Sequence, residues 1–100
     1  MMNLGKMMKD LQKMQSKLQT EIDAMEVEAS SGGGMVTARM NGKKELLDLI
    51  LAADAITPDD PELLQDLVIA AVNEAGRKVD AEIQQKTQGM MPGLKIPGLG

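Results

Sequence analysis

Four lysines near the start of the chain recur at intervals of three or four residues: Lys6, Lys9, Lys13 and Lys17. On an α-helix, with about 100° per residue, these four side chains fall within an arc of roughly 80°. Ammonium groups spaced by about one turn, roughly 5 Å, can follow a line of phosphates without reading bases. An ordinary solvated helix face carries lysines at the same spacing. The pattern therefore indicates either a phosphate-binding stripe or a plain hydrophilic face.

A second group of cations flanks the dipeptide Asn41-Gly42. This dipeptide favours a two-residue type I′ turn, because both turn positions need a positive φ. Such a turn would place Arg39 directly opposite Lys44, with Lys43 beside them. Like charges that face each other across two strands are unfavourable without an anion nearby. We therefore expect either a second phosphate contact here or a charged guard against aggregation of an edge strand.

The composition excludes several other kinds of chemistry. The 100-residue chain has no Cys, no His and no aromatic residue. It can form no disulfide, no thiolate nucleophile, no Ser-His relay and no zinc site of the usual Cys/His type. It also lacks the rings on which single-stranded nucleic acids stack. We expect no enzymatic activity, no metal and no cofactor.

The net charge of −4 argues against a nucleic-acid partner unless the charges are segregated. Residues 1–18 hold four lysines and one acid, Asp10, and so carry a net charge of +3. Residues 45–66 hold seven acids and no Lys or Arg, which gives −7. Binding to double-stranded DNA requires these acids to face away from the phosphates. A homodimer could meet that requirement by presenting two basic stripes together.

The elements that must position these cations can be read from the apolar pattern. Apolar residues advance by alternating steps of four and three, with Gln15 filling the one missing place: Leu4, Met8, Leu11, Leu18, Ile22 and Met25. With Asn3 as N-cap, this heptad seam predicts a helix of about six turns. Because such a helix outreaches the core of a monomer of this size, we expect a second chain against it.

After the predicted helix, apolar and polar residues alternate with a period of two, as they do in β-strands. Gly32-Gly33-Gly34 indicates a turn, and residues 35–40 form the clearest alternating segment. A returning strand should run from Lys43 or Glu45 towards Leu51. With a two-residue turn, one face of the sheet is coherent and apolar: Val36, Ala38, Leu47, Leu49 and Leu51. The opposite face carries Leu46 and Ile50, which are too apolar to be wholly solvated. We assign both to a homodimer interface.

Asp60-Pro61 starts a second long helix, with Asp as N-cap and Pro at the first helical position. Its main apolar stripe runs from Leu63 to Ile83, and Ile69 lies on another side, so we add Ile69 to the dimer interface. Residues 1–88 then form one dimerising domain, and residues 89–100, rich in Gly and Pro, form a flexible tail. No run approaches the roughly 20 apolar residues of a membrane span. We expect a cytoplasmic protein without a membrane partner.

Four blocks of sequence are specific in combination: residues 7–15 (MMKDLQKMQ), 26–36 (EVEASSGGGMV), 40–43 (MNGK) and 62–75 (ELLQDLVIAAVNEA). Together they resemble the YbaB/EbfC family of small bacterial nucleoid-associated proteins over nearly the whole chain. The resemblance implies an α+β chain in the order α-β-β-β-α, with two long helices flanking a small antiparallel sheet whose first strand is residues 27–31. It further implies a tweezer-like homodimer that binds double-stranded DNA with little sequence preference and affects nucleoid organisation and gene expression, without catalysis.

Two rival functions fit the same residues. The seam and the tail could dock to another protein, in an adaptor with negligible DNA affinity, and gel shifts at low salt would separate this function from DNA binding. The first helix could instead lie on a membrane surface, although it lacks the Trp or Phe that usually seats such helices. Co-sedimentation with vesicles tests that alternative.

Overall fold

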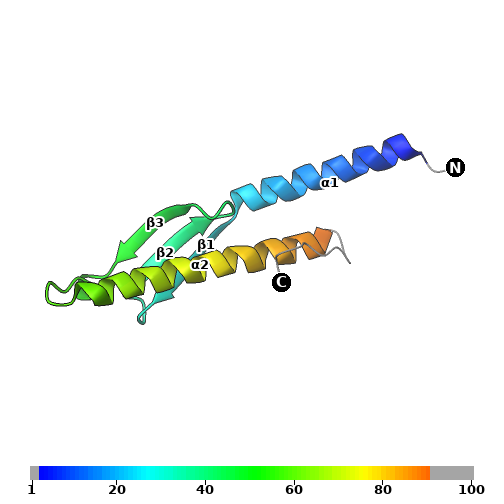
Figure 1. Cartoon of the computed structure of the whole chain (residues 1–100). Helices are drawn as coiled ribbons and strands as arrows, with labels where there is room; N and C mark the ends of the chain where they lie inside the picture. Colours follow the sequence, from blue (N-terminus) through cyan, green and yellow to red (C-terminus); the bar gives the residue numbers. More distant parts are fainter. Residues whose placement is uncertain (1–2, 91–100) are drawn as a thin grey trace.

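The chain folds in the order α-β-β-β-α, which confirms the predicted α+β class. In the computed structural model, which describes residues 3–90, helix α1 spans Leu4–Ala24 and helix α2 spans Pro61–Met90. Between them lie β1 (Glu26–Ser31), β2 (Val36–Asn41), β3 (Leu46–Leu51) and a single 3-10 turn at Ala53–Ala55 (Figure 1). Helix α2 continues through the first two residues of the predicted tail. The rest of that tail, 91–100, lies outside the described residues.

The core lies between the sheet and α2. The three strands form one antiparallel sheet in the order β1-β2-β3, and α2 packs across β1 and β2. Fully buried residues of β2 meet small residues of the helix: Val36 and Ala38 against Ala71, Ala75 and Val79. Alanines on this face of α2 let the helix axis approach the sheet closely. Strand β3 is left at the sheet edge, outside the cover of α2.

Local sequence signals set the starts of both helices as predicted. The side-chain oxygen of Asn3 accepts a hydrogen bond from the backbone N–H of Lys6 at 3.2 Å. The carboxylate of Asp60 accepts one from the N–H of Leu63 at 3.1 Å, directly before α2 begins at Pro61. Each cap satisfies a backbone donor that the first helical turn leaves without a partner.

The hairpin between β2 and β3 differs from the predicted two-residue turn. Asn41 is still part of β2, and its N–H donates to the carbonyl of Glu45, so Gly42, Lys43 and Lys44 form a longer loop. The Asn41 side chain accepts from the N–H groups of Lys43 (2.9 Å) and Glu45 (3.0 Å). The left-handed conformation falls on Lys44, at φ 61°, instead of on Gly42. The Asn side chain thus folds the loop as an Asx turn, which competes with the type I′ geometry.

This loop changes the register between β2 and β3. An irregularity between Arg39 and Met40 pairs Met40 with Leu46, whereas a two-residue turn would have paired it with Lys43. The predicted inner face is therefore only partly correct. Val36 and Ala38 are buried and Leu49 is half-buried, but Leu47 and Leu51 are exposed because α2 does not extend over β3.

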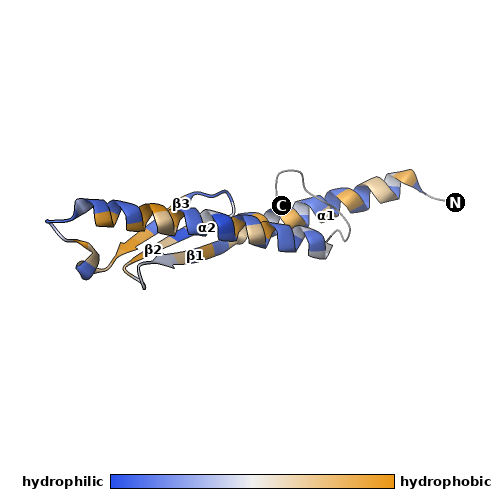
Figure 2. Ribbon diagram, turned by 60° about the horizontal axis from the view of Figure 1, so that its bottom comes forward, coloured by the Kyte–Doolittle hydropathy of each residue, from blue (hydrophilic) through white to orange (hydrophobic). Residues whose placement is uncertain are grey.

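Helix α1 projects from the rest of the molecule as an arm (Figure 1). The chain measures 73 × 22 × 16 Å, and its radius of gyration is 18.7 Å, against about 13 Å for a compact chain of this length. None of the residues of α1, all of which the structure describes, is buried. Apolar and polar residues alternate along the arm (Figure 2). Its first three turns expose an apolar strip, here called the open seam: Leu4, Met7, Met8 and Leu11.

Candidate nucleic-acid interface

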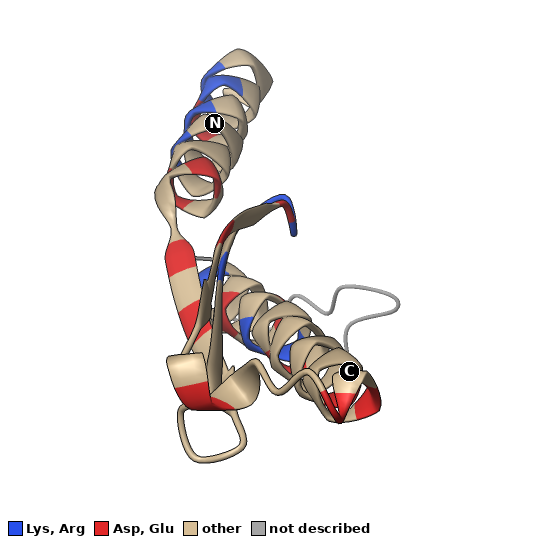
Figure 3. Cartoon of the chain, turned by 90° about the vertical axis from the view of Figure 1, so that its left-hand side faces the viewer, with Lys and Arg blue, Asp and Glu red and all other residues tan. Residues whose placement is uncertain are grey.

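The four lysines of the predicted stripe are all exposed on α1: Lys6, Lys9, Lys13 and Lys17. Within residues 3–90 none of them forms an ion pair, and none of their ammonium groups donates a hydrogen bond. Viewed along the long axis, the basic residues of α1 gather on one flank of the arm (Figure 3). We call this row the lysine stripe.

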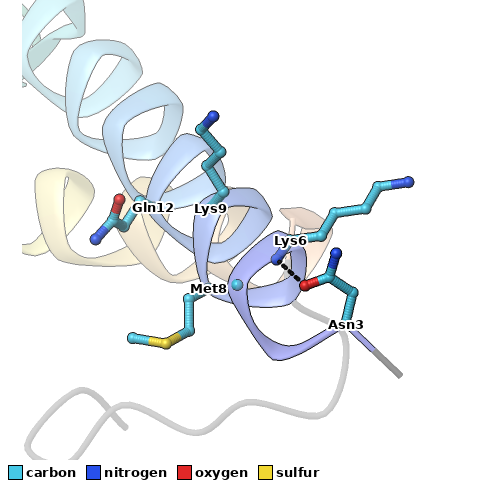
Figure 4. Close-up of a pocket in the computed structure, with 6 residues that line it drawn as sticks. Asn3, Lys6, Met8, Lys9 and Gln12 are labelled. Atoms are coloured by element: carbon cyan, nitrogen blue, oxygen red, sulfur yellow. Dashed lines mark hydrogen bonds between the residues drawn. The ribbon is translucent and has the colours of Figure 1, made fainter. Parts of the chain in front are cut away.

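The lysine stripe and the open seam occupy opposite faces of α1. Helical periodicity places the centres of the two rows about 180° apart. Figure 4 shows the start of the arm, where Lys6 and Lys9 extend into solvent while Met8 points to another side. Both lysines border a shallow hollow that is also lined by Asn3, Met8 and Gln12. A ligand can therefore reach the ammonium groups without displacing the apolar residues.

The charges of α1 are placed opposite to the order that the helix dipole favours. The first turn of α1 holds no acid and the last turn holds no base, although acids near a helix N-terminus and bases near its C-terminus stabilise a helix by about 0.3–1 kcal/mol each. Of the three acids of the arm, Glu21 and Asp23 lie at its base and only Asp10 lies in its outer half. This arrangement lowers the stability of the helix slightly but concentrates positive charge at the end that projects furthest.

The predicted cation cluster at the hairpin is wrong in its geometry. Arg39 faces Asp48 in the register, and its guanidinium lies between Glu26 (3.8 Å) and Asp48 (3.9 Å). The ammonium of Lys44 pairs with Asp80 of α2 at 2.8 Å. Arg39 and Lys44 are therefore not cross-strand neighbours, because the longer loop moves Lys44 away.

Of the three cations predicted at the hairpin, only Lys43 has no acidic partner among the described residues. Its side chain is exposed at the loop, while its backbone N–H is bound by Asn41. The sequence predicted three cations free to contact phosphate at the hairpin, whereas only one of them lacks an acidic partner among the described residues.

Most cations of α2 are also engaged. Arg77 pairs with Glu74, one turn earlier on the same helix, at 2.7 Å. Lys78 donates instead to the backbone carbonyl of Glu28, at 2.7 Å, and so ties α2 to β1. Sequence reasoning did not consider Lys86, which has no ion pair within residues 3–90. Its position near the end of a long helix was the only available signal.

The acidic segments lie far from the lysine stripe. The acids that open α2, including Asp59, Asp60 and Glu62, sit at the end of the molecule opposite the tip of the arm (Figure 1). Figure 3 shows the same separation, with red residues at the start of α2 and blue residues on the outer part of α1. The segregation that DNA binding would require is therefore present within one chain, despite a net charge of −4.

A second exposed surface is apolar and lies on β3 and α2. Leu46 and Ile50, both assigned to a dimer interface from the sequence, are 45% and 55% exposed. On α2, Leu64, Val68 and Ile69 line an open hollow. By helical periodicity, this hollow is on the same side of α2 as the residues that face the β2–β3 loop, Val72 and Gly76. On β3, Leu46 pairs with Met40, which is buried on the α2 side of the sheet, whereas Ile50 pairs with Thr37 on the other face, so the exposed apolar residues of β3 lie on both faces of the strand.

Two other features, a metal-holding group of acids and a membrane-spanning helix, are absent from the described part of the chain. Among residues 3–90 there is no group of three or more acidic side chains placed to hold a metal ion. In the same part of the chain, neither helix is long and apolar enough to cross a membrane.

Comparisons with known proteins agree with the fold and place the chain in a family. The model of the YbaB/EbfC DNA-binding family matches residues 1–94. A protein of Clostridium novyi named as nucleoid-associated is 44% identical over 101 residues, covering 98% of this chain and 89% of its own. One from Koribacter versatilis with the same description is 43% identical over 96 residues, covering 96% and 95%.

A solved structure shares the fold. The crystal structure of an uncharacterised protein from Helicobacter pylori superimposes with a TM-score of 0.72 at 26% identity, covering 91% of this chain and 99% of that one. Because the family model matches nearly the full length, this chain belongs to the YbaB/EbfC DNA-binding family.

Proposed function

We propose that this protein is a nucleoid-associated protein that binds double-stranded DNA as a homodimer, through phosphate contacts made by the lysine stripe of α1. The observation that carries the proposal is the contrast between cations. Arg39, Lys44 and Arg77 each lie against acids, whereas the four lysines of the projecting arm have no acidic partner among the described residues. The family and the names of the relatives support DNA as the partner and the nucleoid as the location.

The chemistry of the stripe favours binding with little sequence preference. Lysine offers a point charge on a flexible stem, whereas Arg has a rigid planar fork of donors that fixes geometry more closely. Phosphate contacts fix the position of a protein on the duplex without carrying sequence information. Lys43 at the hairpin is a further phosphate contact in this proposal. Arg39 and Lys44 would join it only where their ion pairs open.

The exposed apolar residues of β3 support the homodimer in this proposal. An uncovered edge strand with exposed large apolar side chains is an aggregation hazard unless another element pairs with it or covers it. Leu46 and Ile50 of β3, together with Ile69 of α2, form the interface in this proposal, and Leu47 and Leu51 extend it. A second copy brings two lysine stripes, with up to eight lysines, into one assembly.

The experiment that tests the function compares two charge-matched double variants. Lys9→Gln with Lys13→Gln removes two lysines from the stripe, whereas Lys44→Gln with Arg77→Gln removes two cations that are held by acids. Binding to a labelled 30-base-pair duplex is measured by fluorescence anisotropy at fixed salt. We expect the first pair to weaken binding at least about tenfold on every duplex sequence, and the second to change it less than about threefold.

Equal losses in both double variants would show that net charge, and not the stripe, controls binding. Undetectable binding of the unmodified protein at low salt would leave the adaptor function in its place. All four substituted side chains are exposed, so we expect both double variants to fold. Circular dichroism of each variant checks this.

A further inference from the structure

The lysine stripe is carried by the part of the molecule that has the least support. Residues 4–13 of α1 are all exposed. Closer to the sheet, Met14, Leu18 and Ile22 are half-buried, and Ile22 packs against the core. A single residue, the buried Met25, joins the end of α1 to the start of β1. The direction of the arm is therefore set at its base.

The β2–β3 loop is braced by one side chain, that of Asn41. Its oxygen accepts hydrogen bonds from the backbone N–H groups of Lys43 (2.9 Å) and Glu45 (3.0 Å), and its amide nitrogen donates to the Glu45 carboxylate at 2.8 Å. The backbone carbonyl of Asn41 also accepts from the N–H of Lys44 at 3.0 Å. Side-chain bonds of this kind fix a turn locally. The position of Gly42, at the tip of the loop, therefore depends on Asn41.

The tip of this loop packs on the base of the arm. Gly42 is buried, and a Cβ placed on it would lie 2.8 Å from the carbonyl carbon of Ile22. In Figure 1 the β2–β3 turn lies beside the end of α1. Ile22 is in the last turn of α1, and its carbonyl accepts from the N–H of Met25 at 3.2 Å. Backbone therefore packs directly on backbone, with no flexible side chain between them that could yield.

A small tilt at this contact becomes a large displacement at the lysine stripe. Lys6 lies about 24 Å from Ile22 along the helix, since each residue rises about 1.5 Å. A tilt of about 10° therefore moves Lys6 by roughly 4 Å, more than the rise of about 3.4 Å between successive phosphates of one DNA strand. Two stripes gain avidity on one duplex only while both reach their phosphates at once. A loosely held arm would lose DNA affinity although every lysine is present.

We propose that Asn41 is a positioning residue for DNA binding: its Asx turn holds Gly42 against Ile22 and so fixes the direction of the lysine stripe. Asn41 makes no contact with DNA in this arrangement and acts only through the loop. The inference rests on the proposed function, because a fixed direction matters for affinity only where two stripes bind one duplex.

Three charge-matched variants test this role. Asn41→Ala removes all three hydrogen bonds of the side chain. The rescue variant, Asn41→Asp with Glu45→Gln, keeps an oxygen for the two backbone N–H groups and reverses the side-chain hydrogen bond between positions 41 and 45. Ser31→Ala is the stability control, because it removes a neutral hydrogen bond to the carbonyl of Leu67 (2.6 Å) at the end of β1 furthest from α1. Circular dichroism and urea denaturation check that each variant folds.

The direction of the arm is measured first, without DNA. Spin labels are attached to Gln12→Cys in α1 and Ala70→Cys in α2, two exposed sites in a chain that has no Cys of its own. Dilution with unlabelled chains leaves one labelled chain in each assembly. We expect the distribution of label distances to broaden at least about twofold in Asn41→Ala, and to stay unchanged in the rescue variant and in Ser31→Ala. An unchanged distribution in Asn41→Ala, or equal broadening in the rescue variant, would overturn the proposal.

Affinity for the 30-base-pair duplex is then measured for the same variants without labels. Asn41→Ala should bind at least about fivefold more weakly than the unmodified protein, and the rescue variant and Ser31→Ala should stay within about twofold of it. Unchanged affinity in Asn41→Ala, or an equal loss in Ser31→Ala, would overturn the positioning role. Absence of DNA binding by the unmodified protein would instead overturn the proposed function, and with it this role in DNA binding, while the label distances would still show whether Asn41 directs the arm.

Discussion

Gly42 lies directly against Ile22. A Cβ placed on Gly42 would lie 2.8 Å from the carbonyl carbon of Ile22 and would overlap its carbonyl oxygen. The tip of the β2–β3 hairpin therefore closes on the last turns of α1, and this contact fixes the direction in which the arm leaves the sheet. Only a residue without a side chain fits at this point.

Gly42→Ala should destabilise the protein because backbone atoms, which cannot move aside cheaply, occupy the space the methyl group needs. We expect a loss of at least about 2 kcal/mol in the free energy of unfolding, measured by urea denaturation. Gly33→Ala is the control. Nothing lies within 4 Å of its added methyl group, and its φ of 68° is the sole penalty, so it should cost about 1 kcal/mol. A smaller loss for Gly42→Ala than for Gly33→Ala would remove the steric explanation.

Gly76→Ala, in contrast to Gly42→Ala, should raise the free energy of unfolding. Gly76 is inside α2 and nothing lies within 4 Å of an added methyl group. Alanine stabilises a helix interior by up to about 1 kcal/mol relative to glycine. A rise in the urea midpoint is therefore expected at low protein concentration. A fall in the midpoint would contradict this expectation and would show that the notch beside Met40 and Val72 does not tolerate the methyl group.

Ile50→Lys should separate the proposed homodimer into folded monomers. The side chain is 55% exposed in the single chain, so the charge causes little damage to the monomer, but it would be buried against the second copy. Ile56→Lys is the matched control, since Ile56 is 56% exposed and lies outside β3. Sedimentation velocity measures the mass. If both variants remain dimeric, the interface is on another surface.

Asp60→Ala should weaken the start of α2. The substitution removes the acceptor for the N–H of Leu63 and a negative charge at the positive end of the helix. The expected loss is about 1 kcal/mol in the free energy of unfolding. Asp59→Ala, which removes a neighbouring charge but leaves that hydrogen bond in place, should cost clearly less. Equal losses would assign the effect to charge alone.

The parts of the fold that sequence analysis predicted correctly depend on local signals. The caps at Asn3 and Asp60 and the glycine turn each act within four residues or fewer. The hairpin was mispredicted although its signal is also local: the Asn41 side chain accepts from the N–H groups of Lys43 and Glu45, and this Asx turn competes with the type I′ turn that Asn-Gly favours.

The same distinction applies to the candidate site. The stripe could be read from helical spacing alone, because its four lysines belong to one helix. The pairing of Lys44 with Asp80 joins residues 36 positions apart and could not be inferred from the sequence around either one. The hairpin cations were therefore overestimated as phosphate contacts.

The most direct test of the central claim is the salt dependence of DNA affinity. Dissociation constants for one duplex are measured between 50 and 300 mM KCl, for the unmodified protein and for a variant with all four stripe lysines changed to Gln. If the eight lysines of a dimer displace counterions, the logarithm of the association constant (1/Kd) should fall against the logarithm of the salt concentration with a slope approaching about −7, and the variant should lose most of that slope. A slope near zero for the unmodified protein, or an unchanged slope in the variant, would contradict binding by the lysine stripe.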